Sequence, residues 1–178
     1  MTAWVALVRG VNVGGGNRLP MAELRASIES LGYDDVTTYI QSGNVVFCTD
    51  EAEHDIVDRI RAVVADRHGL SVPVVVRAGD ELAGLADRHP FAADGIDPKL
   101  LHVAFLDRRP DVAGGPDPDR WLPDRWAVAG RELFLAYPGG SARSKMTIDQ
   151  FERPWGVTAT ARNVNTIVQL ADLVASIT

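Results

Sequence analysis

The sequence predicts an α+β fold of two ferredoxin-like halves packed as one compact unit, with mainly antiparallel sheet. Strand and helix patterns in residues 1–78 follow the order β-α-β-β-α-β, which is the ferredoxin-like plan. In that plan the strands lie in the order 4-1-3-2, so the first strand is interior and the fourth lies at an edge. Pro73 stands in the fourth strand, and proline is tolerated at a sheet edge because it has no N–H to donate.

The elements of the first half follow from hydrophobic spacing and turn residues. Asp50 and Glu53 have the spacing of a capping box, which predicts the start of the second helix. In chain order the predicted elements are a strand at 3–9, a helix from Pro20 to Gly32, a hairpin of strands at 36–40 and 45–49, a helix ending before Gly69 and a strand at 72–77.

The second half, residues 79–178, is predicted to be a related or irregular α+β unit. Thr147 and Gln150 have the spacing of another capping box, and the last helix is expected to begin near Asn163. Its predicted elements are a short helix at 80–89, a strand at 100–107, a loop at 108–125, a hairpin around Gly130 and Arg131, and two helices. Because no linker separates the halves, the chain is expected to form a single domain over residues 1–178.

Composition narrows the class of protein. The 178 residues carry a net charge of −6, and residues 34–137 hold eleven basic against nineteen acidic side chains. This acidic middle argues against a duplex DNA partner, which needs a positive field. One cysteine, Cys48, excludes an internal disulfide and fits a reducing compartment. With no predicted signal or membrane segment, the protein is expected to be cytoplasmic, without a membrane partner.

The stretch VRGVNVGGGNRLPMAEL, residues 8–24, resembles a phosphate-binding loop only in part. A Walker loop needs Lys and then Ser or Thr after its last glycine, and here Gly16 and Asn17 follow Gly15. The glycine spacing of a dinucleotide fingerprint is also absent. What is left is a flexible loop with many N–H groups, flanked by Arg9 and Arg18, which suits an anion.

The predicted topology places this loop beside the hairpin turn QSGN, because the first two strands point the same way. One polar rim is therefore expected to form from the two loops. The alternative is that these side chains only satisfy the backbone of the turns, which commonly use Asn, Ser and Gly. The candidate ligand-binding residues of the rim are Arg9, Asn12, Gly14, Gly15, Asn17, Gln41, Ser42 and Asn44.

Three further candidate ligand-binding residues lie in the second half. Arg162 and Asn163 stand at the start of the last helix, where backbone N–H groups favour an anion. The alternatives are that Asn163 caps this helix and that Arg162 pairs with a carboxylate. Lys145, one of only two lysines, stands in a glycine-containing loop and could add a point charge, or it is simply solvated.

No metal or cofactor site is predicted, because the four histidines lack ligand spacing and have no cysteine partner. Ser141, Ser144 and Lys145 lack the S-x-x-K spacing of a Ser–Lys nucleophile. The leading hypothesis is a small module that binds a phosphorylated or otherwise anionic small ligand. The alternatives are a single-stranded nucleic-acid-binding domain and an enzyme that acts on phosphate-containing substrates without a covalent nucleophile.

Three stretches carry a family resemblance: LVRGVNVGGGNRLPMAELRASIESLGYDDVTTYIQSGNVVF, YPGGSARSKMT and TATARNVNTIVQLADL. They resemble, in the same order, the signature stretches of a bacterial family catalogued as domain of unknown function sixteen-ninety-seven. Gly16 and Arg18 stand in a loop that often carries lysine in this family, and Val164 stands where an aromatic residue is common. The resemblance implies a ferredoxin-like α+β fold and no established function.

Overall fold

The computed structural model describes residues 1–177, whose contacts gather into two units. The first unit comprises residues 1–83 together with the chain from Gln169 onward, and the second comprises residues 84–168. Helices are combined with two four-stranded antiparallel sheets, which confirms the predicted α+β class. None of the helices within residues 1–177 is both long and apolar enough to cross a membrane.

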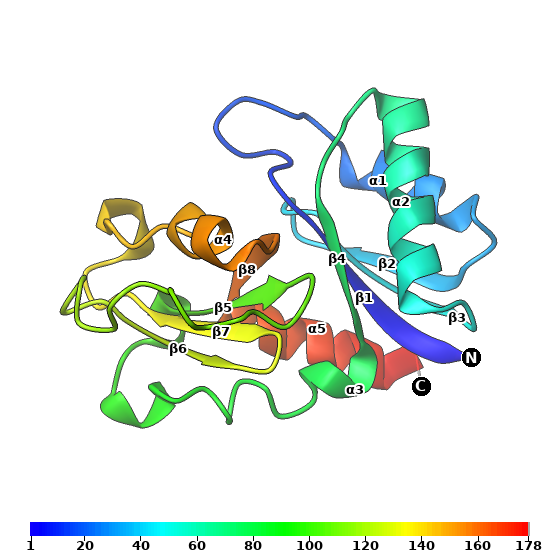
Figure 1. Cartoon of the computed structure of the whole chain (residues 1–178). Coiled ribbons are helices and arrows are strands. Elements are labelled where there is room, and N and C mark those ends of the chain that lie inside the picture. Colours follow the sequence, from blue (N-terminus) through cyan, green and yellow to red (C-terminus); the bar gives the residue numbers. More distant parts are fainter. Residues whose placement is uncertain (178) are drawn as a thin grey trace. The chain divides into compact units, whose positions relative to one another are not determined.

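The first unit contains one sheet with the strand order β2-β3-β1-β4, every pair antiparallel (Figure 1). Its elements are β1 (Thr2–Val8), α1 (Met21–Glu29), β2 (Asp34–Tyr39), β3 (Asn44–Thr49), α2 (Glu53–His68), β4 (Val74–Ala78) and α3 (Gly79–Leu82). As predicted, β1 is interior and β4 is an edge strand. Pro73 lies just before β4, where its carbonyl accepts the Arg9 N–H at 2.9 Å.

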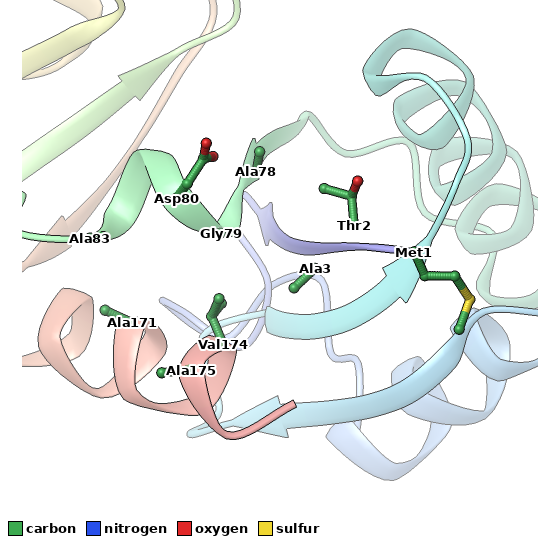
Figure 2. A pocket seen from close by; sticks show the side chains of 10 residues that line it. All are labelled: Met1, Thr2, Ala3, Ala78, Gly79, Asp80, Ala83, Ala171, Val174 and Ala175. Carbon is green, nitrogen blue, oxygen red and sulfur yellow. The ribbon is translucent and has the colours of Figure 1, made fainter. Parts of the chain in front are cut away.

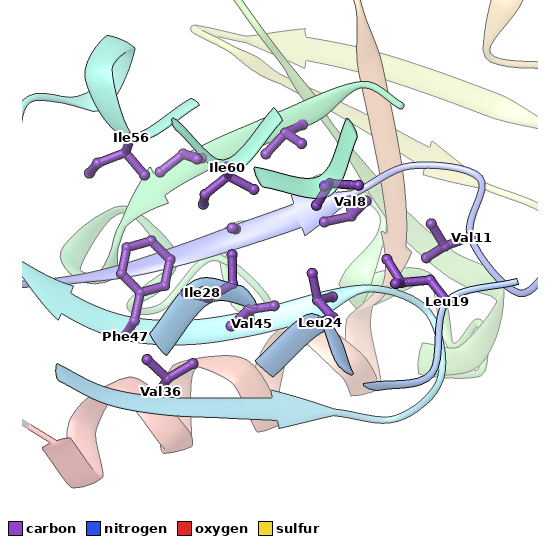
Figure 3. Packing of buried hydrophobic residues seen from close by; sticks show 14 of the residues in the cluster. Val8, Val11, Leu19, Leu24, Ile28, Val36, Val45, Phe47, Ile56 and Ile60 are labelled. Atoms are coloured by element: carbon purple, nitrogen blue, oxygen red, sulfur yellow. The ribbon is translucent and has the colours of Figure 1, made fainter. Parts of the chain in front are cut away.

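The helices α1 and α2 cover one face of this sheet, and the main apolar core lies between the two layers (Figure 3). Alternate residues of the strands point into this core because strand side chains alternate between faces. Phe47 from β3 and Ile60 from α2 are fully buried there. Val11 and Leu19 belong to the same core and fix both ends of the loop between β1 and α1.

The second unit contains a sheet with the strand order β6-β7-β5-β8, again antiparallel throughout. Its strands are β5 (Leu101–Leu106), β6 (Arg125–Ala129), β7 (Glu132–Ala136) and β8 (Ala159–Asn163). Its helices are η1 (Ala92–Asp94), η2 (Pro98–Leu100), η3 (Ser141–Arg143) and α4 (Asp149–Trp155). The helix α5 (Val164–Ile177) follows β8, and from Gln169 onward it belongs to the first unit. The predicted strand, irregular crossover, hairpin and last two helices are all present, whereas the helix predicted at 80–89 is limited to α3, Gly79–Leu82.

The two sheets share one topology, with β5 to β8 in the places of β1 to β4. The register of the edge strands also agrees, since Val5 pairs with Arg77 in the first sheet and Val103 with Arg162 in the second. The edge strands β4 and β8 therefore each carry an arginine at corresponding positions of the two sheets. Arg77, which the sequence did not single out, is fully buried, and its Nε lies 3.8 Å from Oε1 of Glu81.

An aromatic cluster fills one side of the second sheet. Phe151 is fully buried at its centre, with ring centroids of Trp121, Trp126 and Trp155 between 5.3 and 5.5 Å away. Edge-to-face and tilted contacts of this kind are favourable for aromatic rings. Gly115 approaches the same cluster so closely that a Cβ would lie 2.6 Å from Nε1 of Trp155.

Both predicted capping boxes are wrong. The helix α2 begins at Glu53, so Ala52 is its N-cap and provides no side-chain hydrogen bond, while Asp50 lies 3.3 Å from the N-terminal amine. The helix α4 begins at Asp149 without a side-chain cap, and the Thr147 hydroxyl instead donates to Asp149. In each case the helix starts later than the spacing requires.

Candidate functional site

The loop between β1 and α1, residues 9–20, is called the glycine loop below. Asn12 closes its base with its side chain. Oδ1 of Asn12 accepts the Leu19 N–H at 2.8 Å, and Nδ2 donates to the Leu19 carbonyl at 2.7 Å. The Asn12 N–H donates to the carbonyl of Asn17, whose own Nδ2 donates to the Gly10 carbonyl at 3.2 Å. The two asparagines therefore join the two ends of the loop by hydrogen bonds.

A tight turn forms the tip of the glycine loop. The Gly16 N–H donates to the Val13 carbonyl at 3.3 Å, and both central residues, Gly14 and Gly15, have positive φ. Positive φ at both central positions defines a type I′ turn and explains why these two residues are glycine. Within residues 1–177 no protein acceptor meets the N–H groups of Gly14 or Gly15, and both glycines are exposed.

Hydrogen bonds and close packing also fix the turn between β2 and β3. Asn44 is fully buried, and its Nδ2 donates to the Tyr39 carbonyl at 3.1 Å and to Ser42 Oγ at 2.9 Å. Gly43 has a φ of +76° and packs so closely that a Cβ would lie 2.8 Å from the Val8 carbonyl oxygen. The polar groups of Ser42 and Asn44 therefore stabilise the turn itself.

The glycine loop and the β2–β3 turn lie at the same end of the strands of the first sheet, as the topology predicted. Nδ2 of Asn12 donates to the Gln41 carbonyl at 2.9 Å, and the Val8 N–H donates to the Gly43 carbonyl at 2.8 Å. The structure therefore brings together the eight candidate residues of the first unit. They are Arg9, Asn12, Gly14, Gly15, Asn17, Gln41, Ser42 and Asn44.

Two arginines lie within the glycine loop, one on each side of its tip. Arg9 is half-buried at the end of β1, where its backbone N–H is bound by the Pro73 carbonyl. Arg18 is exposed on the α1 side of the loop and forms no ion pair with any residue of the described chain. A solvated guanidinium next to unclaimed backbone N–H groups favours an anion.

The remaining three candidates, Lys145, Arg162 and Asn163, belong to the second unit. Asn163 caps α5, because its Oδ1 accepts the Thr166 N–H at 2.9 Å, which confirms that interpretation. Arg162 donates from Nη1 to Thr160 Oγ1 at 2.9 Å and to the Ala161 carbonyl at 2.8 Å. Burial lowers the pKa of Arg162 to about 10, so its guanidinium is still charged at neutral pH.

Lys145 is exposed on the loop that follows β7. Its neighbour Ser144 donates to Oδ2 of Asp124 at 2.6 Å and accepts the Met146 N–H at 2.8 Å, so this hydroxyl is bound within the fold. The loop begins where the Tyr137 N–H donates to the Leu100 carbonyl at 3.0 Å, at the start of β5. The β5 register places Asn163 opposite His102, so α5 begins at the same edge of the second sheet.

A Ser–His–Glu arrangement in the first unit was not predicted, because its members are far apart in sequence. Ser27 Oγ lies 2.8 Å from Nε2 of His68, and Nδ1 of His68 lies 3.5 Å from Glu23 Oε2. Ser27 is only 1 % exposed, and its hydroxyl donates to the Glu23 carbonyl of its own helix at 2.9 Å. A buried hydroxyl committed to a helix carbonyl cannot reach a substrate, so the arrangement links α1 to α2.

A cavity of about 440 Å³ lies elsewhere in the first unit, between the start of β1, the β4–α3 junction and the last turns of α5 (Figure 2). Gly79 is one of its lining residues, and a Cβ at this position would lie 2.3 Å from Cγ1 of Val174. Asp80 is the only ionisable side chain among the lining residues. The lining is otherwise small and mostly apolar: Met1, Thr2, Ala3, Ala78, Ala83, Ala171 and Ala175.

The described part of the chain holds no group of three or more His, Cys, Asp or Glu side chains that could bind a metal ion. Cys48 is buried in β3, and desolvation by burial raises the pKa of its thiol. A buried thiol with a raised pKa is a poor nucleophile. The functional candidates are therefore the backbone N–H groups and basic side chains of the loops.

The comparisons with known proteins give a family and a fold. Residues 1–134 match the family described as protein of unknown function, DUF1697. No curated protein matches the chain. A solved structure of a conserved bacterial protein from Streptococcus pneumoniae is similar, with a TM-score of 0.71 and 20 % identity over 97 % of this chain and 98 % of that one. This likeness shows the fold alone. Because the family match spans most of the sequence, the chain belongs to the DUF1697 family of proteins of unknown function.

Proposed function

We propose that this protein is a small module that binds a phosphorylated or otherwise anionic small ligand at the tip of the glycine loop. The observation that carries the proposal is Gly16. Its φ lies outside the left-handed region, and a Cβ built on it would meet nothing within 4 Å. The fold therefore has no need of glycine at this position. A glycine without a structural reason is expected where a ligand approaches the backbone closely.

Hydrogen-bond donors support an anion as the ligand. Gly14 and Gly15 are exposed, their N–H groups have no acceptor in the described chain, and they belong to a turn whose base is closed by Asn12 and Asn17. Pre-positioned backbone donors bind an anion without first being ordered. Arg18 adds a positive charge beside them, and Arg9 stands at the other end of the loop.

The other candidate groups are used less directly. The side chains of Asn12, Ser42 and Asn44 form hydrogen bonds within and between the two loops. We therefore assign them the role of shaping the site. Ligand contacts by Lys145, Arg162 and Asn163 of the second unit stay predictions. The buried, unpaired Cys48 supports a reducing, cytoplasmic setting for the ligand.

Calorimetric titration with pyrophosphate tests the proposal on the full chain. Arg18→Met keeps the apolar stem and removes the charge, so it should weaken binding about tenfold, as expected for one charge-assisted hydrogen bond. Arg61→Met is the matched control, because Arg61 is also an exposed arginine of the first unit but lies in the middle of α2. It should leave the affinity unchanged.

Gly16→Ala separates a ligand site from a simple turn. Alanine restricts the unfolded chain and fits the native backbone at this position, so the variant should be more stable by about 0.4–1 kcal/mol. If the ligand approaches Gly16, the same variant should bind pyrophosphate more weakly. Unchanged affinity in both Arg18→Met and Gly16→Ala, or no binding by the wild type, would refute the site.

A further inference from the structure

Ile40, at the first position after β2, has a conformation that its side chain disfavours. Its φ is +47°, in the left-handed region, and its side chain is 49 % exposed. A β-branched residue in this region is a genuine outlier, whereas Asn and Gly adopt it readily. The buried Asn44 and the closely packed Gly43 fix the turn, so the backbone at this position is imposed on Ile40.

Neither burial nor backbone preference explains isoleucine at position 40. A strained and exposed residue of this kind points to a role for its side chain outside the fold. Isoleucine offers only apolar surface. The group that contacts it is therefore apolar.

A second exposed aliphatic side chain lies on the adjacent glycine loop. Val13, the first residue of the tight turn at the tip of the glycine loop, is 59 % exposed. The hydrogen bond from Asn12 to the Gln41 carbonyl joins the two loops one residue away from each of these side chains. Apolar surface, unclaimed N–H groups of Gly14 and Gly15, and the charge of Arg18 thus occur together at one edge of the first sheet.

We infer that the ligand of this edge is a phosphate monoester with an apolar organic body, such as an alkyl or aryl chain. The inference rests on the proposed anion site and adds the nature of the rest of the ligand. The phosphate would accept hydrogen bonds from Gly14 and Gly15 and pair with Arg18. The organic body would then cover Ile40 and Val13, and burial of this apolar surface adds affinity. A ligand with a polar body of similar size gains nothing from these two side chains.

Three probes with one headgroup test the inference on the full chain by calorimetric titration. They are inorganic phosphate, glycerol 3-phosphate and hexyl phosphate. Wild-type protein should bind hexyl phosphate about tenfold more tightly than glycerol 3-phosphate. Ile40→Asn should abolish this preference, leave the affinity for inorganic phosphate unchanged, and raise Tm because asparagine relieves the backbone strain. The rise in Tm shows that lost affinity is not a folding defect.

Val112→Asn is the control, since Val112 is an exposed aliphatic residue of similar exposure, 53 %, on a loop of the second unit. It should keep the preference for hexyl phosphate. Equal affinities of the wild type for the two esters, or a preference that survives Ile40→Asn, would overturn the inference. If inorganic phosphate still binds in that case, the proposed anion site is retained. Failure of all three probes to bind would instead remove the anion site itself.

The same phosphate ester could be a free molecule or the headgroup of a lipid. Sedimentation with phosphatidylcholine vesicles, with and without phosphatidate, separates the two sources. Retention that requires phosphatidate and is lost in Ile40→Asn assigns the ester to a lipid. Binding of hexyl phosphate without vesicle retention assigns it to a free molecule, and both results support an apolar phosphate ester.

Discussion

His89 illustrates how burial fixes the protonation state of a single side chain. It is 3 % exposed, and its Nδ1 accepts the Phe91 N–H at 3.3 Å. Its Nε2 therefore carries the proton and donates to the His102 carbonyl at 3.1 Å. A second proton on Nδ1 would face an N–H group. Desolvation by burial lowers the pKa of His89, and it lowers the pKa of His102 as well.

These two histidines should make the second unit sensitive to mild acid. Because both folded-state pKa values lie below the unfolded value of about 6.5, their contribution to stability is complete above pH 6.5 and is lost as the pH falls through the folded values. We expect the free energy of unfolding to fall by up to about 1.4 kcal/mol per pH unit for each histidine that takes up a proton. Urea unfolding followed between pH 7 and pH 5 measures this slope.

His89→Gln provides the control for that slope. A glutamine amide can still donate to the His102 carbonyl but does not titrate, so the variant should be less stable at pH 7 and have a shallower pH dependence. The pKa values of Asp97 and Asp107 are also lowered, so these carboxylates lose their contribution only below about pH 4. An unchanged slope in His89→Gln would show that other groups cause the acid sensitivity.

Among the elements, the β2–β3 turn is the one that most depends on close packing. Gly43→Ala adds a Cβ 2.8 Å from the Val8 carbonyl and from Cγ2 of Val11, at a φ of +76°. Gly10→Ala is a matched control, because its φ is +71° but its Cβ would meet nothing within 4 Å. The control should lose about 1–2 kcal/mol from backbone strain alone, and Gly43→Ala about 1–3 kcal/mol more from overpacking. Equal urea midpoints for the two variants would contradict this account.

Most elements could be predicted because their signals are local. Apolar runs predicted the strands, and their β-α-β-β-α-β order predicted the arrangement of the first sheet, with which the edge position expected from Pro73 agreed. The capping boxes failed because the two expected cap residues have other partners, Asp50 in the N-terminal amine and Thr147 in Asp149. Spacing alone does not reveal that competition.

The candidate site could be predicted only in its location. Topology placed the two loops at one edge, but the burial of Asn44 and the strain at Ile40 depend on the exact turn geometry, which the letters QSGN do not specify. The contact of Ser27 with His68 joins residues 41 positions apart and has no local signal. Sequence reasoning therefore found the loops and missed the side chains that make them unusual.

For the molecule as a whole, the negative net charge disfavours the approach of nucleic acids. The net charge is −6, and the acidic excess lies in residues 34–137. Random single-stranded RNA should therefore show at most weak retention in filter binding, and that retention should disappear as salt is raised. Tight binding that resists salt would contradict the argument and favour the nucleic-acid alternative.

The aromatic cluster places most of the tryptophan fluorescence of the chain in the second unit. Of the four tryptophans, Trp121, Trp126 and Trp155 surround Phe151 in the second unit, and Trp4 alone belongs to the first. Intrinsic fluorescence therefore reports mainly on the second unit, whereas α1 and α2 contribute ellipticity from the first. Trp4→Phe would make the emission specific to the second unit. A denaturation experiment that records both signals can then tell whether the two units melt together or in sequence.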